Sequence, residues 1–328
     1  MKDAGIVYVA TKDERYVAEA FLSASSVKDL VPDMPVTLFT NLEDSVFAQD
    51  DCFDTVIPIG TIERYSSQWS EGQLDRILCL PNSPYRYTLH LDTDTRVRSA
   101  EIRDVFAFLD DHDIAMVECA PDASVSRHHY GRAMFNVGFI LYRRNEKVMA
   151  LLKAWGELTA EYFGLANLDV VPKVDCLAHI ADPELRRKLL FMDQTSMVQL
   201  LSPEVNKFGL DLRILDESWN FRGATGDRKL KQPLKVDHQP ALRNVLGRDI
   251  VNSAIRYQSS GNADRALAIL DGLLARAPND TGLMKVIANC HMQSGDFERA
   301  GQIIMRALAI QPADQDLQAA LTTVRARI

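Results

Sequence analysis

The chain repeats its own pattern at a spacing of 34 residues from Arg248 to its end. The pairs Ser260-Gly261 and Ser294-Gly295 lie one period apart, and each stands between two segments whose apolar residues have helical spacing. Alanines recur at matching places, Ala254 with Ala288 and Ala266 with Ala300. Small residues let two helices pack closely, and glycine permits a tight turn between them. The repeat therefore predicts stacked helical hairpins, each of which needs its neighbour to bury its apolar face.

This period resembles the tetratricopeptide repeat, in which glycine separates two helices, alanine lies in the second helix and proline follows it. Pro278 and Pro312 stand at that exit. We expect two repeats over about 248–315 and a capping helix over Leu317 to Ile328, so that residues 248–328 form a small all-α domain. Such arrays bind a protein partner in some proteins and form a homodimer in others, and the sequence leaves both roles open.

Residues 1–247 alternate short apolar runs with helical patterns and form the other predicted domain. We expect strands at 6–10, 35–40, 55–59, 87–92, 114–118 and 137–142, and helices at about 17–27, 71–80, 101–110 and 146–163. Continuous apolar strands joined by helices indicate an α/β, Rossmann-like fold with a mostly parallel sheet covered by helices on both faces. Ligands of such sheets bind beyond the carboxyl ends of the strands.

Composition and charge exclude several classes of protein. The 328 residues are 47% hydrophobic and 25% charged, as is usual for a globular chain. The net charge of −8 lies in residues 1–247, since the later charges nearly balance, and it argues against a nucleic-acid partner. No apolar run approaches the roughly 20 residues of a transmembrane segment, and the start of the chain does not resemble a secretory signal. Five scattered cysteines without metal-ligand spacing complete the case for a cytoplasmic location.

The triplet Asp92-Thr93-Asp94 closes the strand expected at 87–92. Two carboxylates one residue apart at this edge can hold a hard divalent cation, and that cation can bridge a diphosphate. The alternative is a strand-end turn in which aspartate satisfies backbone hydrogen bonds. Two similar triplets, Asp111-His112-Asp113 and Asp314-Gln315-Asp316, lie where helices end or repeats join, and we expect them to be solvated caps.

Five segments in one order resemble nucleotide-sugar transferases with the GT-A fold, and family 8 and related bacterial transferases in particular. They are 80–94 with the D-x-D triplet, 135–143 with Asn136 and Gly138, Asp193-Gln194, Trp219-Asn220, and His238 after 235–237. The resemblance covers roughly residues 5–240 and implies a GT-A fold for this domain.

The resemblance implies that Asp92, Asp94 and His238 coordinate Mn²⁺ or Mg²⁺. Two carboxylates and an imidazole suit Mn²⁺ better than Mg²⁺, which prefers oxygen ligands. The cation would stabilise charge on a leaving diphosphate. One departure concerns the phosphates: the family's late motif continues with glycine and lysine, whereas Gln239 and Pro240 follow here. Lys235, Arg243 and Arg248 are the candidate replacements for that lysine.

The resemblance also assigns a donor site and an acceptor site. Ala10, Thr11, Arg76, Asp92, Thr93, Asp94 and Gly138 would bind the nucleotide sugar and its metal, and Asp193, Gln194 and Asn136 would be catalytic. Asp193 would bind the hydroxyls of the transferred sugar, and Gln194 would lie near its anomeric carbon. Acceptor specificity is expected in 146–191 and in the loop at 126–130.

Several of these residues have a structural alternative. Arg76 suits an exposed helix position, and Asp193 could be an N-cap. His238 could be a loop histidine without a ligand role. Trp219 could stack on a sugar or belong to the core. The neighbouring His128 and His129 point apart in a strand or loop, which disfavours a zinc site.

The implied activity is that of a hexosyltransferase, which moves a sugar from a nucleotide-diphosphate sugar, with UDP favoured, to a glycan, a lipid-linked saccharide or a protein. The resemblance to the retaining family implies that the configuration of the sugar is retained, and no carboxylate base for inversion stands out in the sequence. A nucleotidyltransferase would need a glycine-rich basic loop, which Thr11 to Arg15 does not provide. A glycosidase would need paired carboxylates but explains none of the other segments. An inactive GT-A domain that serves a tetratricopeptide scaffold stays open as the alternative.

Overall fold

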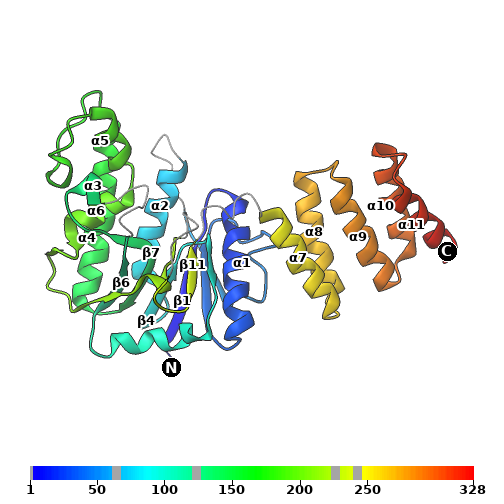
Figure 1. The fold of residues 1–328 in the computed structure, drawn as a ribbon, viewed down its shortest axis with the longest axis horizontal. Helices are drawn as coiled ribbons and strands as arrows, with labels where there is room; N and C mark the ends of the chain where they lie inside the picture. Colours follow the sequence, from blue (N-terminus) through cyan, green and yellow to red (C-terminus); the bar gives the residue numbers. More distant parts are fainter. Residues whose placement is uncertain (1–2, 61–67, 120–126, 223–229, 239–245) are drawn as a thin grey trace. The chain divides into compact units, whose positions relative to one another are not determined.

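A computed structural model describes residues 3–60, 68–119, 127–222, 230–238 and 246–328 (Figure 1). The chain forms two compact units, Met1–Pro240 and Ala241–Ile328. The domain boundary at 247/248 stays a prediction. Within the described parts of the chain, no helix is both long and apolar enough to cross a membrane.

The first unit is built on a sheet whose described strands run in the order β10-β6-β7-β4-β1-β2-β3. Their bounds are β1 Ala4–Val9, β2 Val36–Thr40, β3 Thr55–Pro58, β4 Tyr87–Leu91, β6 Ile114–Glu118, β7 Phe135–Arg143 and β10 Leu212–Leu215. All neighbours are parallel except β7, which is antiparallel to both β4 and β6. The start of β7 therefore lies at the same edge as the end of β4.

Helices cover both faces of this sheet. Val7 and Val9 of β1 pack in a cluster with Cys79 of α2 (Gln68–Cys79). The residue between them, Tyr8, points the other way, because side chains alternate along a strand, and its hydroxyl is 2.9 Å from the Ser23 hydroxyl of α1 (Glu14–Leu30). The predicted fold class, a mostly parallel α/β unit followed by an all-α unit, is confirmed.

A large apolar cluster lies between the sheet and three helices. Trp155 of α4 (Glu146–Ala166) is fully buried there together with Ile140 of β7 and Met197 of α6 (Asp193–Leu200). The indole nitrogen of Trp155 donates a hydrogen bond to the Asp193 carbonyl at 2.9 Å. The core thus fixes the start of α6, where two predicted site residues lie.

Short elements complete the first unit. Two pairs of strands are antiparallel: β5 (Thr95–Val97) with β11 (Val236–His238), and β8 (Leu201–Ser202) with β9 (Val205–Asn206). The helix expected at 101–110 is a 3₁₀ helix, η2 (Ala100–Leu109). The remaining elements are η1 Leu80–Asn82, α3 Arg127–Tyr130, η3 Asp175–Leu177, α5 Pro183–Leu190 and η4 Glu217–Trp219.

The prediction that Asp113 belongs to a solvated helix cap is wrong. Asp113 is 3% exposed, and its carboxylate accepts hydrogen bonds from Arg143 at 2.8 Å and Asn145 at 2.6 Å. It also accepts one from the backbone N–H of Asp211 at 2.9 Å, so it joins three segments of the chain. These long-range contacts leave no trace in the local sequence. Asp314 does cap a helix, since its side chain accepts from the N–H of Leu317 at the start of α11.

The second unit contains the predicted helical hairpins. Its helices are α7 Leu246–Ser259, α8 Ala263–Arg276, α9 Thr281–Ser294, α10 Phe297–Ile310 and α11 Gln315–Arg325. The four alanines that mark the repeat are buried: Ala254, Ala266, Ala288 and Ala300. Gly261 and Gly295 have φ of +86° and +84°, the left-handed conformation that favours glycine at a helix C-terminus.

Replacement of Gly295 should test this turn. We expect Gly295→Ala to lower the free energy of unfolding by about 1 kcal/mol, because a Cβ is disfavoured in the left-handed region. Gly247→Ala is the matched control: a Cβ at Gly247 meets no atom of the described residues within 4 Å, and its φ lies outside the left-handed region. Urea unfolding of the full chain measures both. An unchanged stability of Gly295→Ala would contradict the proposed role of the turn.

Candidate metal centre

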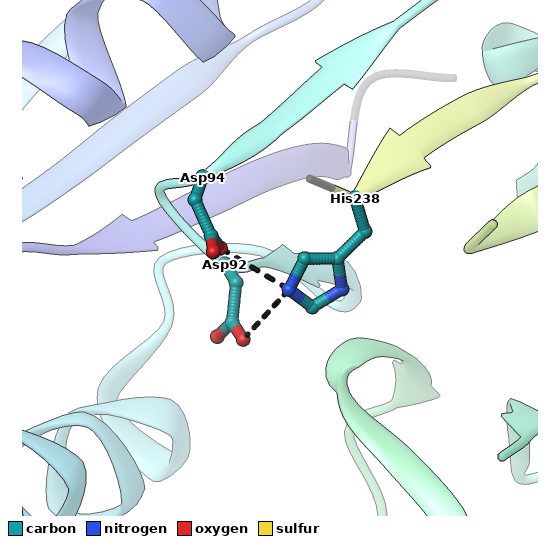
Figure 2. A group of neighbouring side chains, drawn as sticks. All are labelled: Asp92, Asp94 and His238. Atoms are coloured by element: carbon teal, nitrogen blue, oxygen red, sulfur yellow. Dashed lines mark ion pairs between the residues drawn. The ribbon is translucent and has the colours of Figure 1, made fainter. Parts of the chain in front are cut away.

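Two short structural features bring Asp92, Asp94 and His238 together. Asp92 directly follows β4, and Asp94 directly precedes β5. The antiparallel pairing of β5 with β11 sets His238 opposite Thr95. The Nε2 atom of His238 is then 3.1 Å from an Asp94 carboxylate oxygen and 3.6 Å from one of Asp92, as Figure 2 shows. One potential ligand atom from each residue lies within 4.8 Å of the others.

Asn220 fixes the orientation of the histidine. Its side-chain oxygen is 2.8 Å from Nδ1 of His238, and an amide oxygen can only accept, so Nδ1 carries the proton. Nε2 therefore presents its lone pair to the two carboxylates, which is the arrangement of a metal-binding histidine. The His238 side chain is fully buried. His238 thus lies on β11 with hydrogen-bond partners, and its role as a metal ligand stays a prediction.

Gly138 makes room for the cluster. A Cβ on this residue would stand 2.4 Å from an Asp92 carboxylate oxygen and 2.5 Å from Cε1 of His238. The backbone holds the two strands in place, because the N–H of Asp92 donates to the Gly138 carbonyl at 2.9 Å. The space that glycine provides is thus filled by two of the candidate ligands themselves.

Arg76 connects the cluster to α6. Its guanidinium forms an ion pair with Asp92 and another with Asp193. Arg76 is 9% exposed, which excludes the exposed helix position. Asp193 is not an N-cap, since Met192 occupies that position and makes no side-chain cap bond. The backbone N–H of Asp193 instead donates to the Gln73 side chain at 3.0 Å.

These charges set the ionisation of the two aspartates. Burial alone would raise the pKa of Asp92, but the Arg76 guanidinium holds that pKa well below its usual value. Burial opposes ionisation of Asp94 as well, yet the Arg222 guanidinium helps to lower its pKa. Both side chains are therefore carboxylates at neutral pH, the form that a cation requires.

Asn136 and Gln194 lie at the same edge of the sheet. The Asn136 side-chain oxygen accepts from the N–H of Gly138 at 2.9 Å. The Gln194 amide nitrogen donates to the Phe135 carbonyl at 2.8 Å and lies 3.3 Å from the Cys119 sulfur. Burial raises the pKa of Cys119 to about 11, so its thiol stays neutral.

The other predicted residues lie around this group. Ala10 and Thr11 follow β1 and are buried, and the Thr11 hydroxyl donates to Asp75 at 3.0 Å. The Thr93 side chain points toward α1, where it donates to Glu19 at 3.1 Å. Trp219 is a core residue that packs against Phe108 and Phe139. Lys235 lies over its ring and pairs with Glu101.

Part of the predicted acceptor region lies outside the described residues. Ser126 and the side chains of Arg127 and His128 lie outside the described residues, as does Arg243. Among the described residues, Asp92, Asp94 and His238 form the one group with metal-ligand geometry.

Sequence reasoning missed Arg222 and His90, which touch the cluster, and it gave Asn220 no role although Trp219-Asn220 belongs to the resemblance. The roles of Asn220 and Arg222 depend on β11, which is too short to predict. His90 gave a weak signal, because it is a polar residue inside the apolar run of β4. Its Nδ1 is 3.2 Å from the Val7 carbonyl and its Nε2 is 3.5 Å from Asp92, and burial lowers its pKa.

Two comparisons with known proteins give matches. A family model described as tetratricopeptide repeat matches residues 257–324. A galactosyltransferase, LgtC, in complex with donor and acceptor sugar analogues covers 72% of this chain and 87% of its own at 16% identity, with a TM-score of 0.45. An active-site mutant of LgtC gives the same values. The glycosyltransferase GlyE in Streptococcus pneumoniae TIGR4 covers 72% of this chain and 54% of its own at 15% identity, with a TM-score of 0.39.

No curated protein matches the chain. Residues 257–324 form a tetratricopeptide-repeat region, as the sequence predicts.

Gly138→Ala should test whether the cluster of Asp92, Asp94 and His238 binds a metal. We expect it to weaken Mn²⁺ binding at least about tenfold, because the new methyl group collides with two of the three candidate ligands. The same collision should lower stability by about 1–3 kcal/mol. Titration calorimetry and urea unfolding measure the two effects. Gly164→Ala is the control, since a Cβ there meets nothing within 4 Å. Wild-type Mn²⁺ affinity in Gly138→Ala would show that the cluster does not bind the metal.

Proposed function

We propose that this chain is a metal-dependent glycosyltransferase that transfers a hexose from a nucleotide-diphosphate sugar, UDP-hexose in the first instance, to a separate acceptor. The observation that carries the proposal is the ion pairing of Arg76 with both Asp92 and Asp193. This pairing joins a candidate metal centre to the carboxylate that the sequence assigns to the transferred sugar. A metal ligand and a sugar-binding residue need to be neighbours if one donor molecule is to contact both.

The donor set fits a divalent transition metal. Asp92 and Asp94 supply charged oxygen ligands, and His238 supplies a neutral nitrogen whose tautomer is fixed by Asn220. One imidazole among carboxylates favours Mn²⁺ over Mg²⁺. When bound, the cation supplies Lewis-acid stabilisation of the charge that grows on the leaving diphosphate.

The chain's own residues position the donor around that centre. Ala10 and Thr11 hold the base and ribose at the end of β1. Arg76 contacts the donor between its diphosphate and its sugar, and Asp193 accepts hydrogen bonds from the sugar hydroxyls. Gln194 and Asn136 line the side from which the acceptor approaches, since both lie at the start of β7 or against it. These groups are buried and hydrogen-bonded in advance, which limits the reorganisation that binding requires.

We further propose that the reaction retains the configuration of the sugar. Inversion needs a carboxylate that is free to accept the acceptor's proton on the face opposite the leaving group. Asp193 is engaged by Arg76, and Asp92 and Asp94 belong to the metal centre. The departing phosphate is then the base that takes this proton.

Removal of the two carboxylates tests the activity. We expect Asp92→Asn/Asp94→Asn to remain folded, because asparagine keeps the size of aspartate, and to lose Mn²⁺-dependent donor binding and hydrolysis. Release of UDP from UDP-sugars, with and without Mn²⁺, measures the loss. Asp110→Asn/Asp111→Asn makes the same charge change at two exposed positions and should behave as wild type. A wild-type chain without metal-dependent turnover or binding of any common nucleotide sugar would favour the inactive scaffold instead.

The configuration of the product tests the proposed stereochemistry. NMR of the freshly formed glycoside or of the hydrolysed sugar should show the anomeric configuration of the donor. An inverted product would require a base that lies elsewhere in the chain, and it would leave the metal centre itself unaffected.

A further inference from the structure

The candidate metal ligands of this chain include two carboxylates and provide no positive charge of their own. A leaving diphosphate therefore needs a cationic side chain nearby. The lysine that the family places after the late histidine is missing here. Lys235 cannot replace it, because its ammonium group lies over the Trp219 ring and 3.4 Å from Glu101. Arg76 is already shared between Asp92 and Asp193.

Arg222 is the cationic side chain that lies beside the candidate metal ligands. Its Nη2 atom is 3.2 Å from Nε2 of His238, the ring nitrogen that faces Asp92 and Asp94. Since Nδ1 of His238 is bound to Asn220, Nε2 is the acceptor and the guanidinium is the donor. The Nε atom of Arg222 is buried and has no hydrogen-bond partner in the part of the chain that the structure describes.

The backbone of the preceding residue holds Arg222 beside the cluster. The N–H of Phe221 donates to the Val236 carbonyl at 2.9 Å, and the Phe221 carbonyl accepts from the N–H of His238 at 2.8 Å. Arg222 therefore directly follows a residue that is paired with Asp237 on the strand that carries the histidine. Its position depends on the same pairing that forms the metal centre.

We propose that Arg222 binds the leaving diphosphate, and that before the metal arrives it occupies Nε2 of His238 in place of the metal. The inference rests on the proposed function and adds the phosphate-binding residue to it. Nε2 has a single lone pair, which cannot serve a guanidinium and a metal at once. Metal binding therefore releases the Arg222 donors and leaves them within reach of an anion.

Charge balance makes the two events cooperative. Three carboxylates, Asp92, Asp94 and Asp193, face the two guanidiniums of Arg76 and Arg222, so the group carries a formal charge of about −1 without metal. A divalent cation changes this to about +1, which favours a diphosphate and repels Arg222 from the metal. Metal and diphosphate should thus strengthen each other's binding, as linkage requires.

Binding of two diphosphates to the full chain tests the proposal. The probes are UDP and methylenediphosphonate, the second of which has no base and so does not depend on the identity of the nucleotide. In saturating Mn²⁺ we expect Arg222→Gln to weaken both about ten- to a hundredfold, the loss of a charge-assisted hydrogen bond. Arg222→Lys should lose less, because it keeps the charge. With Mn²⁺ alone, Arg222→Gln should bind the metal several-fold more tightly than wild type.

Arg98→Gln is the matched control. Arg98 pairs at 3.3 Å with Asp237, the neighbour of His238 on β11, and it is half-exposed. This variant removes one positive charge next to the same strand, and we expect unchanged affinities for both probes and for Mn²⁺. Thermal unfolding of each variant confirms that it is folded.

The outcomes separate this inference from the proposed function. If wild type binds the probes with Mn²⁺ and Arg222→Gln binds them equally well, Arg222 is not the phosphate ligand, although the proposed function stands. Weaker binding of Mn²⁺ alone by Arg222→Gln would also overturn the inference, since Arg222 would then support the histidine instead of competing for it. A wild-type chain that binds Mn²⁺ but neither probe would overturn both.

Discussion

The candidate metal centre depends on one short strand pairing. Three residues of β11 pair with three of β5, and this register sets His238 beside the two aspartates that lie between β4 and β5. Because side chains alternate along a strand, Asp237 points to the opposite side, where it pairs with Arg98. A shift of one residue would exchange the imidazole for a carboxylate and abolish the donor set. The backbone of Phe221 braces the same strand from its other side, so the register is fixed twice.

Buried carboxylates without counter-charges would destabilise this edge of the sheet, since an unpaired buried charge is costly. Arg76 provides one counter-charge and ties the edge to α6 through Asp193. Arg222 provides a second through His238. The two guanidiniums therefore offset most of the carboxylate charge, and a ligand that binds here must exchange contacts with them. Such an exchange makes the affinity for one ligand depend on the presence of the other.

Sequence patterns predicted the parts of this structure that local physics determines. The apolar strands, the helices and the 34-residue repeat follow from periodicity, and the position of Asp92 at a strand end follows from sheet topology. The partners of Arg76, Asn220 and Gly138 could not be predicted, because they lie on segments far apart in the chain. The burial of Asp113 could not be predicted either. Its local sequence pattern is that of a surface cap, and only the tertiary fold shows that it is buried.

The acidic character of the first unit has a consequence for selectivity. Residues 1–247 carry a net charge of about −9, and the field of this charge repels a free nucleoside diphosphate. A diphosphate that has a divalent cation carries less negative charge and meets less repulsion. The clustered guanidiniums then act only at short range, where solvent does not screen them. Under the proposed function, this charge distribution favours a donor in its metal-bound form over other polyanions.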